Sequence, residues 1–413
     1  MSKIIITPNR LQGSVSVPPS KSIAHRAIIC AALSDSTSVI KNISLSDDIT
    51  ATINAVKLAG AKVTVEGDTA TVTGIKNAGV PVEAFDCNES GSTLRFLVPI
   101  MASLFSEVSF TGKGRLGKRP LDVYYKIFNE QNITYSVQED PFLLSINGRL
   151  KGGSIQVPGD ISSQFITGLL MALPLSETDS EIIVTQNLES KGYIDLTLDV
   201  MKCFGVDVVN EDYKRFLIKG NQRYLSCNYT IEGDYSQAAF FEVANYIGNK
   251  IEINGVNPLS LQGDKQIIDI IKRLKSASLN EIVVVDGSQC PDIIPIAAVA
   301  ACMRSGETHL VNIGRLRLKE SDRLNAIAEE LTKLGANIKL LHDSLTIIGI
   351  DNFNGNAVDS HDDHRIAMML AIASTRSTGK VIINGYESVS KSYPDFFEVF
   401  KTLGGVCCEQ HMG

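Results

Sequence analysis

The chain uses one local pattern six times along its 413 residues. In each copy an extended apolar stretch leads into a short polar turn, and a helix-like run of small and apolar residues follows the turn. Recurrence at about 70 residues predicts a single supersecondary unit used six times, although the step from the fourth turn to the fifth is about 20 residues shorter. The turns are Ser20-Lys21-Ser22, Ser90-Gly91-Ser92, Ser162-Ser163-Gln164, Ser236-Gln237, Ser288-Gln289 and Ser360-His361-Asp362-Asp363.

Each copy also contains a second predicted helix, so the expected unit is a β-α-β-α-β-β block. After Asp322, the residues Leu324, Ile327, Ala328 and Leu331 fall on one face at helical spacing. The predicted fold class is therefore α/β (α+β), with helices packed on small sheets. The second helices are expected to begin near Asp48, Leu121, Tyr193, Asp264, Asp322 and Pro394.

The length of the chain exceeds that of one ordinary core, so two similar domains of three blocks each are expected. One domain is predicted at 20–231 and the other at 1–19 with 232–413, with hinges near Pro19 and Glu232. The active site is expected in the cleft between them. An elongated repeat protein without hinges is the alternative.

Composition argues against several classes of partner. The net charge of −7 argues against nucleic acid, which usually requires a basic excess. No run approaches the roughly 20 apolar residues of a membrane span, so no membrane partner is expected. Residues 1–6 lack the apolar core of a signal peptide and are predicted to form a strand, which favours a cytoplasmic location. The eight cysteines lack the paired spacing of a metal site.

The start of the first predicted helix carries two cations. Free N–H groups and the helix dipole make a helix N-terminus a favourable place for an anion. Lys21 opposes that dipole unless a bound anion compensates, and Ser22 and Arg26 share a face because they are four residues apart. This pattern predicts an anionic, phosphorylated ligand. A solvated Lys and Arg on a surface helix are the alternative.

A second cationic cluster lies at 314–323. Strand alternation would place Arg315, Arg317 and Lys319 on one side, and Lys319 and Arg323 would stack as the next helix begins. Such cations repel one another unless an anion sits among them. Glu320 should stay ionised beside so much positive charge unless it is buried. A surface ion-pair network is the alternative.

Single positions complete the pattern. Arg119 follows a glycine-rich loop, Arg365 opens a predicted helix, and Lys391 precedes another turn. Asp292 lies near the start of an apolar helix, where its charge favours the dipole and where burial could raise its pKa. Capping of that helix is the alternative role. The segment 361–364 is not expected to hold a metal, because no third group of ligands accompanies it.

Taken together, these segments resemble the 5-enolpyruvylshikimate-3-phosphate synthase family, over essentially the whole chain. The resemblance implies transfer of the enolpyruvyl group of phosphoenolpyruvate to shikimate 3-phosphate, without a cofactor or metal, by a monomer that glyphosate inhibits. Glu89, Ser92 and Arg315 depart from the usual family residues. The matching motifs are Pro19-Ser20-Lys21-Ser22 with Arg26, Ser90-Gly91-Ser92 with Arg95, Arg119-Pro120, Ser162-Ser163-Gln164, Ser190-Lys191-Gly192-Tyr193-Ile194-Asp195, Pro291-Asp292, Lys319-Glu320-Ser321-Asp322-Arg323, Asp363-His364-Arg365 and Lys391-Ser392-Tyr393-Pro394-Asp395.

The resemblance also implies the roles of individual residues, and it gives the first domain most of the shikimate 3-phosphate contacts. Lys21, Asp292 and Glu320 are the catalytic candidates. The implied shikimate 3-phosphate residues are Lys21, Ser22, Arg26, Ser162, Ser163, Gln164, Ser190, Tyr193, Asp292, Arg315 and Lys319. The implied phosphoenolpyruvate residues are Lys21, Gly91, Arg119, Gln164, Arg323, Arg365 and Lys391.

Two other functions stay open at this point. A sister family transfers enolpyruvyl to UDP-N-acetylglucosamine, but it typically has Lys-Asn in the first motif and a loop cysteine, whereas this chain has Lys21-Ser22 and no cysteine at 111–119. The other alternative is a non-catalytic phosphate or nucleotide sensor built on the same repeat.

Overall fold

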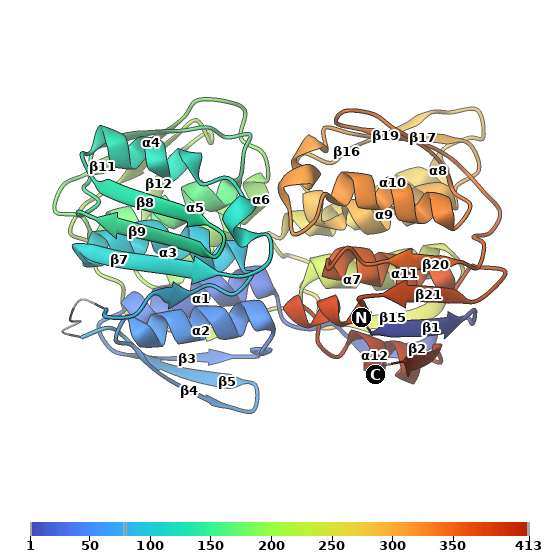
Figure 1. Cartoon of the computed structure of the whole chain (residues 1–413), viewed down its shortest axis with the longest axis horizontal. Coiled ribbons are helices and arrows are strands. Elements are labelled where there is room, and N and C mark those ends of the chain that lie inside the picture. The colour runs from blue at the N-terminus through green and yellow to red at the C-terminus, as the bar shows by residue number, and fades with distance from the viewer. Residues whose placement is uncertain (1, 77–78, 80, 411–413) are drawn as a thin grey trace. The chain divides into compact units, whose positions relative to one another are not determined.

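The computed structural model describes residues 2–76, 79 and 81–410. By its internal contacts the chain divides into two compact units, Pro19–Glu232 and Met1–Pro18 with Gly233–Gly413. The chain therefore crosses between the units twice, after Pro18 and after Glu232 (Figure 1). That these crossings act as hinges stays a prediction.

The unit Pro19–Glu232 contains three four-stranded sheets, with the strand orders β14-β3-β5-β4, β6-β7-β9-β8 and β10-β11-β13-β12. In each sheet the first two strands are parallel and the last two are antiparallel, which is the predicted β-α-β-α-β-β block. Figure 1 shows β7, β9 and β8 side by side. The helices are α1 (Lys21–Leu33), α2 (Asp47–Leu58), α3 (Gly91–Leu104), α4 (Asp122–Glu130), α5 (Ser163–Ala172) and α6 (Lys191–Cys203). The strands are β3 (Thr37–Lys41), β4 (Lys62–Glu66), β5 (Thr69–Thr73), β6 (Phe85–Asp86), β7 (Glu107–Gly112), β8 (Thr134–Glu139), β9 (Phe142–Asn147), β10 (Ser154–Val157), β11 (Ser180–Val184), β12 (Val208–Glu211), β13 (Arg215–Ile218) and β14 (Asn228–Thr230).

The other unit has two four-stranded sheets, β16-β17-β19-β18 and β20-β21-β1-β22, and one two-stranded sheet, β15-β2. Its helices are α7 (Tyr235–Tyr246), α8 (Ile267–Ser276), α9 (Ile294–Cys302), α10 (Arg323–Lys333), α11 (His364–Ser374) and α12 (Phe396–Thr402). Its strands are β1 (Lys3–Thr7), β2 (Gln12–Ser16), β15 (Lys250–Asn254), β16 (Val283–Asp286), β17 (Glu307–Val311), β18 (Asn337–Leu340), β19 (Leu345–Ile348), β20 (Ala357–Asp359), β21 (Val381–Asn384) and β22 (Val406–Gln410).

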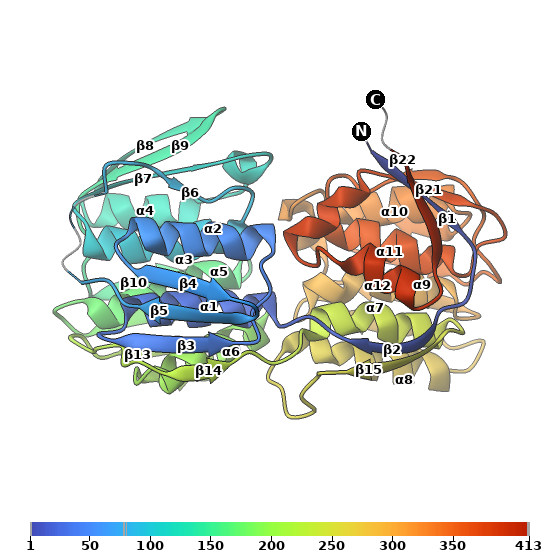
Figure 2. The same ribbon diagram turned by 90° about the horizontal axis from the view of Figure 1, so that it is seen from below.

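The fourth block has fewer strands than the β-α-β-α-β-β pattern predicted for all six blocks. Its strands β2 and β15 run side by side along α7 (Figure 2), and α8 leads directly to β16 of the next block. The antiparallel strand pair that completes the sheets of the other blocks is thus missing from the described chain between 277 and 282. Its loss accounts for the short step between the fourth and fifth polar turns.

In each unit, one sheet is completed by a strand from a distant part of that unit's own sequence. In the first sheet, β14 pairs in parallel with β3, from the opposite end of the unit's sequence. The predicted opening strand forms β1, which lies antiparallel to both β21 and β22. Both units are therefore closed by pairing between segments far apart along the chain.

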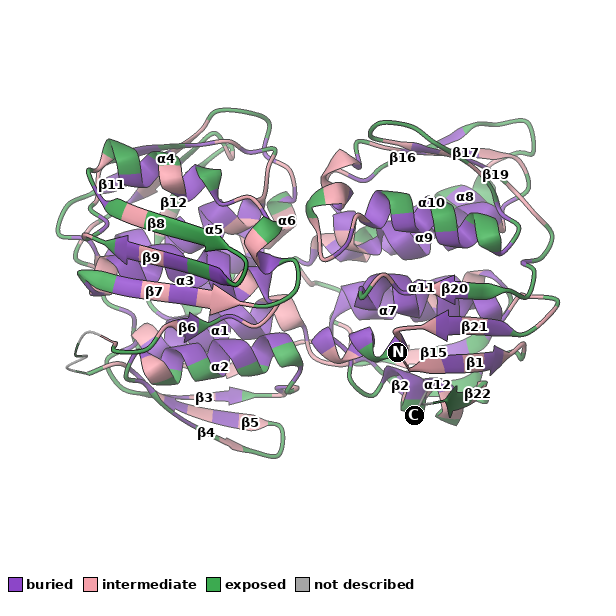
Figure 3. Cartoon of the chain, in the orientation of Figure 1, coloured by how far each residue is buried: buried purple, intermediate pink, exposed green. Residues whose placement is uncertain are grey.

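Two separate hydrophobic cores fill the units. All residues of α9 are buried, so this helix is apolar on every side, as a central helix must be. By contrast, α8 buries only Ile267, Ile270, Ile271 and Leu274, a single face at helical spacing. The prediction for α10 is confirmed, since its four apolar residues are buried. Figure 3 shows a similar contrast between strands, with β8 largely exposed and its neighbour β9 alternating between buried and less buried residues.

Two expectations from composition concern the whole chain. No described helix combines the length and apolarity that a bilayer crossing needs. All eight cysteines are free thiols, four of them buried.

Candidate active site

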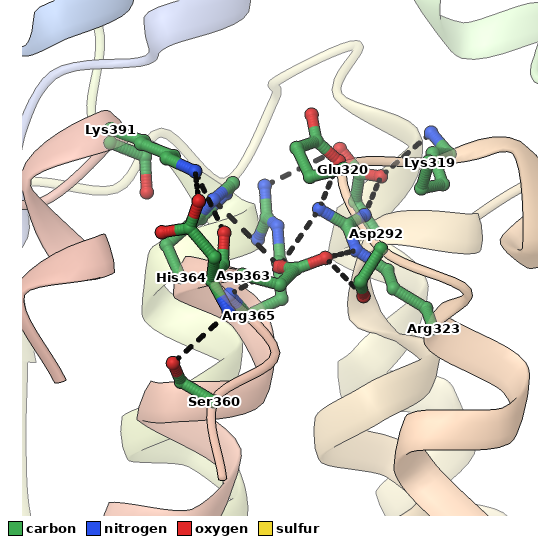
Figure 4. Close-up of polar contacts among 12 residues, drawn as sticks. Asp292, Lys319, Glu320, Arg323, Ser360, Asp363, His364, Arg365 and Lys391 are labelled. Atoms are coloured by element: carbon green, nitrogen blue, oxygen red, sulfur yellow. Dashed lines mark hydrogen bonds and ion pairs between the residues drawn. The ribbon is translucent and has the colours of Figure 1, made fainter. Parts of the chain in front are cut away.

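Asp292 binds three cations in the unit that contains α7 to α12. It follows Pro291 in a short 3₁₀ helix that leads into α9. Its Oδ1 accepts hydrogen bonds from Lys319 Nζ at 3.0 Å and Arg323 Nη1 at 3.1 Å, and its Oδ2 accepts one from Arg365 Nη2 at 3.3 Å. Figure 4 shows these side chains converging on the carboxylate. Cations therefore gather around an anion here, and the anion is a side chain of the protein. A bound anionic ligand at these cations stays a prediction.

The neighbouring charges determine the protonation state of Asp292 and influence that of Lys319. Burial opposes ionisation of Asp292, but the charges of Lys319, Arg365 and Arg323 outweigh it and hold its pKa well below the usual value. The expectation that burial could raise this pKa is therefore wrong. Burial, reinforced by Arg323 and opposed by Asp292, lowers the pKa of Lys319.

Arg323 is almost inaccessible, with 1% of its side chain exposed, and it binds three carboxylates. Its Nε donates to Asp363 Oδ2 at 2.7 Å, and its Nη2 donates to Glu320 Oε2 at 2.6 Å, in addition to the bond to Asp292. These charges raise the pKa of Arg323 in spite of its burial. Asp363 also caps α11 by accepting from the Arg365 N–H at 2.9 Å. The sequence did not reveal Asp363 as a ligand of Arg323, because the two lie 40 residues apart.

Arg365 and Lys391 lie close to this cluster. Arg365 donates through Nη2 to Ser236 Oγ at 2.9 Å and through Nη1 to Ser236 O at 3.2 Å. Lys391 donates to the backbone carbonyl of Asp362 at 2.7 Å and forms an ion pair with its carboxylate at 3.1 Å. Ser236 belongs to the fourth polar turn, so that turn contributes to the cluster as well.

The strand predicted at 315–319 is wrong. Residues Gly314–Leu318 form a 3₁₀ helix, so Arg315, Arg317 and Lys319 do not share one side. Arg315 donates to Ser288 O at 2.8 Å, and Arg317 binds Asp322 at 3.1 Å, while only Lys319 reaches Asp292. The 3₁₀ helix that follows Ile313 leads within five residues to the start of α10, which strand periodicity could not indicate.

In the other unit, Lys21 stands at the first position of α1, as predicted. Its ammonium group binds the Asp48 carboxylate at 2.7 Å, and both side chains are mostly buried. Asp48 lies in the first turn of α2, where a negative charge also favours the dipole. The sequence did not reveal this partner, although the pair Asp47-Asp48 stands at a predicted helix start.

Arg26 occupies the interior between α1, α5 and α6. It donates to Thr197 Oγ1 at 2.8 Å, to Tyr193 O at 3.0 Å and to Ser22 O at 2.5 Å. The predicted common face of Ser22 and Arg26 is thus confirmed. Its guanidinium also lies 5.0 Å from the centre of the Phe96 ring. Burial lowers the pKa of Arg26 to about 10, so it remains a cation at neutral pH.

A chain of buried hydroxyl groups connects α1 with the start of α3. His25 Nδ1 lies 2.7 Å from Thr52 Oγ1, which lies 2.7 Å from Thr93 Oγ1, which donates to Ser90 Oγ at 2.8 Å. Each hydroxyl has one proton, so with Thr93 as the donor the direction of the chain requires His25 to donate from Nδ1. Burial, then the charges of Lys21 and Arg26, lowers the pKa of His25 well below its usual value and keeps it neutral.

The start of α3 is close to Arg119. Ser90 caps this helix by accepting from the Thr93 N–H at 3.2 Å, and Gly91 is its first residue. A Cβ at Gly91 would fall against the Arg119 guanidinium, so any larger residue at this point requires that side chain to move. Gln164, near the start of α5, bridges Ser92 and Arg95 with bonds of 2.9 Å each. These residues thus join two helix starts of the same unit.

The remaining predicted polar residues also lie at helix starts. Ser162 caps α5 by accepting from the Gln164 N–H at 3.3 Å, and Ser163 is the first residue of that helix. Ser190 precedes α6 with a left-handed φ of +58°, and Tyr193 lies in its first turn. The predicted site residues therefore lie in two places, one in each unit, and each of the two predicted substrate groups has members in both units. The first unit contains Lys21, Ser22, Arg26, Gly91, Arg119, Ser162, Ser163, Gln164, Ser190 and Tyr193, and the second contains Asp292, Arg315, Lys319, Glu320, Arg323, Arg365 and Lys391.

His361 has acidic neighbours that the sequence did not reveal. Its Nε2 lies 2.7 Å from Glu330 Oε1, and Glu329 is close enough to form a group of three candidate metal ligands. The buried Glu330 carboxylate already binds Lys333 Nζ at 2.8 Å and the Asp359 N–H at 3.0 Å. These contacts form an ion-pair network that connects α10 with the turn before α11.

The model of one protein family matches residues 5–400, and it describes EPSP synthase (3-phosphoshikimate 1-carboxyvinyltransferase). The chain belongs to the EPSP synthase family. A 3-phosphoshikimate 1-carboxyvinyltransferase of Clostridium botulinum (strain Alaska E43 / Type E3) is 52% identical over 432 residues, covering 100% of both chains. One of Clostridium perfringens (strain 13 / Type A) is 53% identical over 426 residues, covering 99% of this chain and 100% of its own.

Solved structures agree with this family at the level of the fold. An EPSP synthase from Acinetobacter baumannii superposes with a TM-score of 0.81 and 24% sequence identity, covering 100% of both chains. The mixed α/β architecture with two domains, expected from the repeats, is that of an EPSP synthase.

Proposed function

We infer that this protein is a 3-phosphoshikimate 1-carboxyvinyltransferase. It transfers the enolpyruvyl group of phosphoenolpyruvate to the 5-hydroxyl of shikimate 3-phosphate, which yields 5-enolpyruvylshikimate 3-phosphate and phosphate on the route to chorismate. The family match over residues 5–400 supports this reaction. The observation in the structure that carries it is the gathering of Lys319, Arg323 and Arg365 around Asp292, a site suited to anionic substrates.

The reaction needs two proton transfers and stabilisation of charge. In the addition step the 5-oxygen bonds to C2 of phosphoenolpyruvate, the hydroxyl loses its proton, and the methylene carbon gains one. In the elimination step the methyl group of the tetrahedral intermediate loses a proton, the double bond re-forms and phosphate leaves. An acid–base group with a pKa close to the working pH performs such transfers best.

Asp292 suits binding better than proton transfer. Its pKa is held well below the usual range, so its carboxylate is a weak base and a good hydrogen-bond acceptor for a substrate hydroxyl. We assign it that role in shikimate 3-phosphate binding, together with Lys319. Glu320 and Lys21 are left as the groups that exchange protons.

Cations and helix starts account for substrate binding. The planar guanidinium groups of Arg119, Arg323 and Arg365, with the ammonium of Lys391, suit the carboxylate and phosphate of phosphoenolpyruvate. Backbone N–H groups at Gly91 and Ser163, with the side chains of Ser22, Arg26 and Gln164, suit the charged and hydroxyl groups of the two substrates. Ser162, Ser190 and Tyr193 complete the proposed shikimate 3-phosphate group.

A phosphate-release assay tests the reaction. Release from phosphoenolpyruvate should require shikimate 3-phosphate and should persist in a metal chelator. Release with UDP-N-acetylglucosamine instead would favour the sister transferase, and binding of both anions without release would favour a sensor. Glyphosate should compete with phosphoenolpyruvate, and sedimentation should give the mass of a monomer. A cytoplasmic location is part of the same proposal.

A further inference from the structure

The hairpin that joins β12 and β13 ends in a turn with an uncommon central residue. Lys214 N–H donates to Glu211 O at 3.0 Å, and φ is +51° at Asp212 and +58° at Tyr213. Positive φ at both central positions is typical of type I′ turns, which favour Asn and Gly. Asp tolerates this conformation because its short polar side chain can hydrogen-bond to the nearby backbone, whereas the bulky ring of a tyrosine gives no such compensation. Among the described non-glycine residues with positive φ, Tyr213 is the one that is neither Asn, Asp, Ser nor His.

The side chain of Tyr213 is fixed to the beginning of α6. Its hydroxyl donates to Asp195 Oδ1 at 2.7 Å, and Lys191 Nζ lies 5.1 Å from the centre of its ring. Burial, then the Asp195 carboxylate, raises the pKa of Tyr213 to about 12, so the hydroxyl stays a donor at neutral pH. Lys191 and Asp195 are four residues apart and lie on one face of the helix. The ring therefore covers the first turn of α6 on that face.

The opposite face of the same turn meets the proposed substrate residues. Tyr193 stands about half a helical turn from both Lys191 and Asp195. Its carbonyl accepts from Arg26 Nη2 at 3.0 Å and from Thr197 Oγ1 at 2.8 Å. The first turn of α6 is thus held between Arg26 on one face and Tyr213 on the other. An unfavourable backbone conformation that survives with such contacts indicates a functional requirement.

We propose that Tyr213 is a positioning residue that holds the first turn of α6, and with it Ser190 and Tyr193, in the geometry that binds shikimate 3-phosphate. This inference rests on the proposed function. Tyr213 itself does not touch the substrate. It acts through its contacts with Asp195 and Lys191, and these contacts compensate for the unfavourable left-handed conformation of its backbone.

The turn provides a matched pair of variants. Tyr213→Gly relieves the left-handed conformation and removes the contacts to α6. Asp212→Gly relieves the same kind of conformation one residue earlier and keeps those contacts. Tyr213→Phe keeps the ring over Lys191 and removes only the hydrogen bond to Asp195. The two glycine variants should fold, because glycine is favoured at both central positions of this turn. Tyr213→Phe should fold because it keeps the aromatic ring.

Tyr213→Gly should raise the dissociation constant and the KM for shikimate 3-phosphate about tenfold, with kcat at saturation and the KM for phosphoenolpyruvate changed less than about twofold. Tyr213→Phe should give a smaller increase, and Asp212→Gly should match the unmodified protein. The melting temperature of Tyr213→Gly should not fall. Titration calorimetry, steady-state kinetics and thermal unfolding measure these quantities.

Hydrogen exchange gives a readout that does not depend on the substrate. Amides in the first turn of α6 should exchange faster in Tyr213→Gly than in Asp212→Gly, in the absence of ligand. Equal exchange in the two variants, or equal shikimate 3-phosphate affinity, would overturn the proposal. If the unmodified protein does not bind shikimate 3-phosphate, the proposed function fails by itself, and the exchange rates still decide whether Tyr213 positions α6.

Discussion

A Cβ atom placed on Gly91 would collide with Nη1 of Arg119 and lie 2.5 Å from its Cζ. Contacts below 3.0 Å require one partner to move, and Arg119 is 8% exposed, with little room to retreat. The glycine in the second polar turn is therefore explained by the guanidinium beside it. The space beside Gly91 at the start of α3 is thus occupied by the Arg119 guanidinium.

Gly91→Ala should displace the Arg119 guanidinium and raise the KM for phosphoenolpyruvate by about tenfold or more, with a smaller effect on kcat. Arg119→Lys should also act mainly on this KM, because it keeps the charge and loses the planar fork. In the double variant the two effects should be less than additive, since the lysine leaves space for the methyl group. Steady-state kinetics on the four proteins measure the coupling. Gly79→Ala is the control, because a Cβ there meets nothing within 4 Å.

Asp292→Asn should destabilise the protein by about 3 kcal/mol, because the buried Arg323 and Arg365 and the partly buried Lys319 would lose their shared carboxylate. The depressed pKa means that the ionised form stabilises the fold above the unfolded pKa of about 4, and that this contribution is lost only as the pH falls further. The difference in melting temperature should therefore be constant between pH 5 and 8. A difference that shrinks from pH 8 to pH 6 would contradict the assigned charge state. Asp179→Asn, in an exposed pair with Lys219, should change stability little.

The buried His25 should make the stability of the fold depend on pH in a second range, below about pH 6.5. Its folded pKa lies well below that of the unfolded chain, about 6.5, so the unfolded state binds more protons as the pH falls through that value. Stability is complete above pH 7 and decreases below about 6.5, by up to roughly 1.4 kcal/mol for each pH unit. Melting curves at pH 7.5 and 5.5 should show a larger loss for the unmodified protein than for His25→Asn. Parallel losses would contradict a buried neutral histidine.

The same variant tests the chain of hydroxyl groups. An asparagine amide can donate from nearly the position of Nδ1, so His25→Asn should keep the link to Thr52 and the order of the α3 start. His25→Leu removes the donor and should raise the KM for phosphoenolpyruvate severalfold more than His25→Asn does. Thr308→Val, a buried threonine outside the chain of hydroxyl groups, is the control and should leave both KM values unchanged.

Glu320→Gln should lower kcat by about 10² to 10⁴ and largely keep substrate binding, since it keeps the shape and removes an acid–base group. Single-turnover kinetics separate this effect from product release. Glu329→Gln, on the exposed side of α10, should have near-normal kcat. Near-normal kcat in Glu320→Gln itself would make Glu320 only a structural partner of Arg323, and proton transfer would then fall to Lys21.

Much of the fold could be predicted because the repeat places its own landmarks in the sequence. The polar turns and helix starts required only local spacing, and the α10 face required only a period of 3.6 residues. The segment 314–318 shows where such reasoning fails. Alternating cations and leucines suit a strand, but the turn after Ile313 and the contacts of Arg317 with Asp322 favour a 3₁₀ helix.

The sequence indicated which basic residues belong to the candidate site, but not which carboxylates pair with them. Arg323 and Lys21 stand out because basic residues at helix starts oppose the dipole. Their partners Asp363 and Asp48 lie 40 and 27 residues away, and a carboxylate near a helix start has an ordinary explanation as a cap. The pairing depends on how the blocks pack against one another, which no single block specifies.

The pairing of β1 with distant strands has a consequence for biosynthesis. Its two neighbours, β21 and β22, lie at the far end of the chain, and Lys3 is paired with Gln410. Residues 19–232 can complete their own sheets while the ribosome is still producing the rest, since β14 lies within them. The first strand must then wait, unpaired, for roughly 10 to 40 seconds of further translation. Its apolar residues are a natural target for a chaperone during that interval.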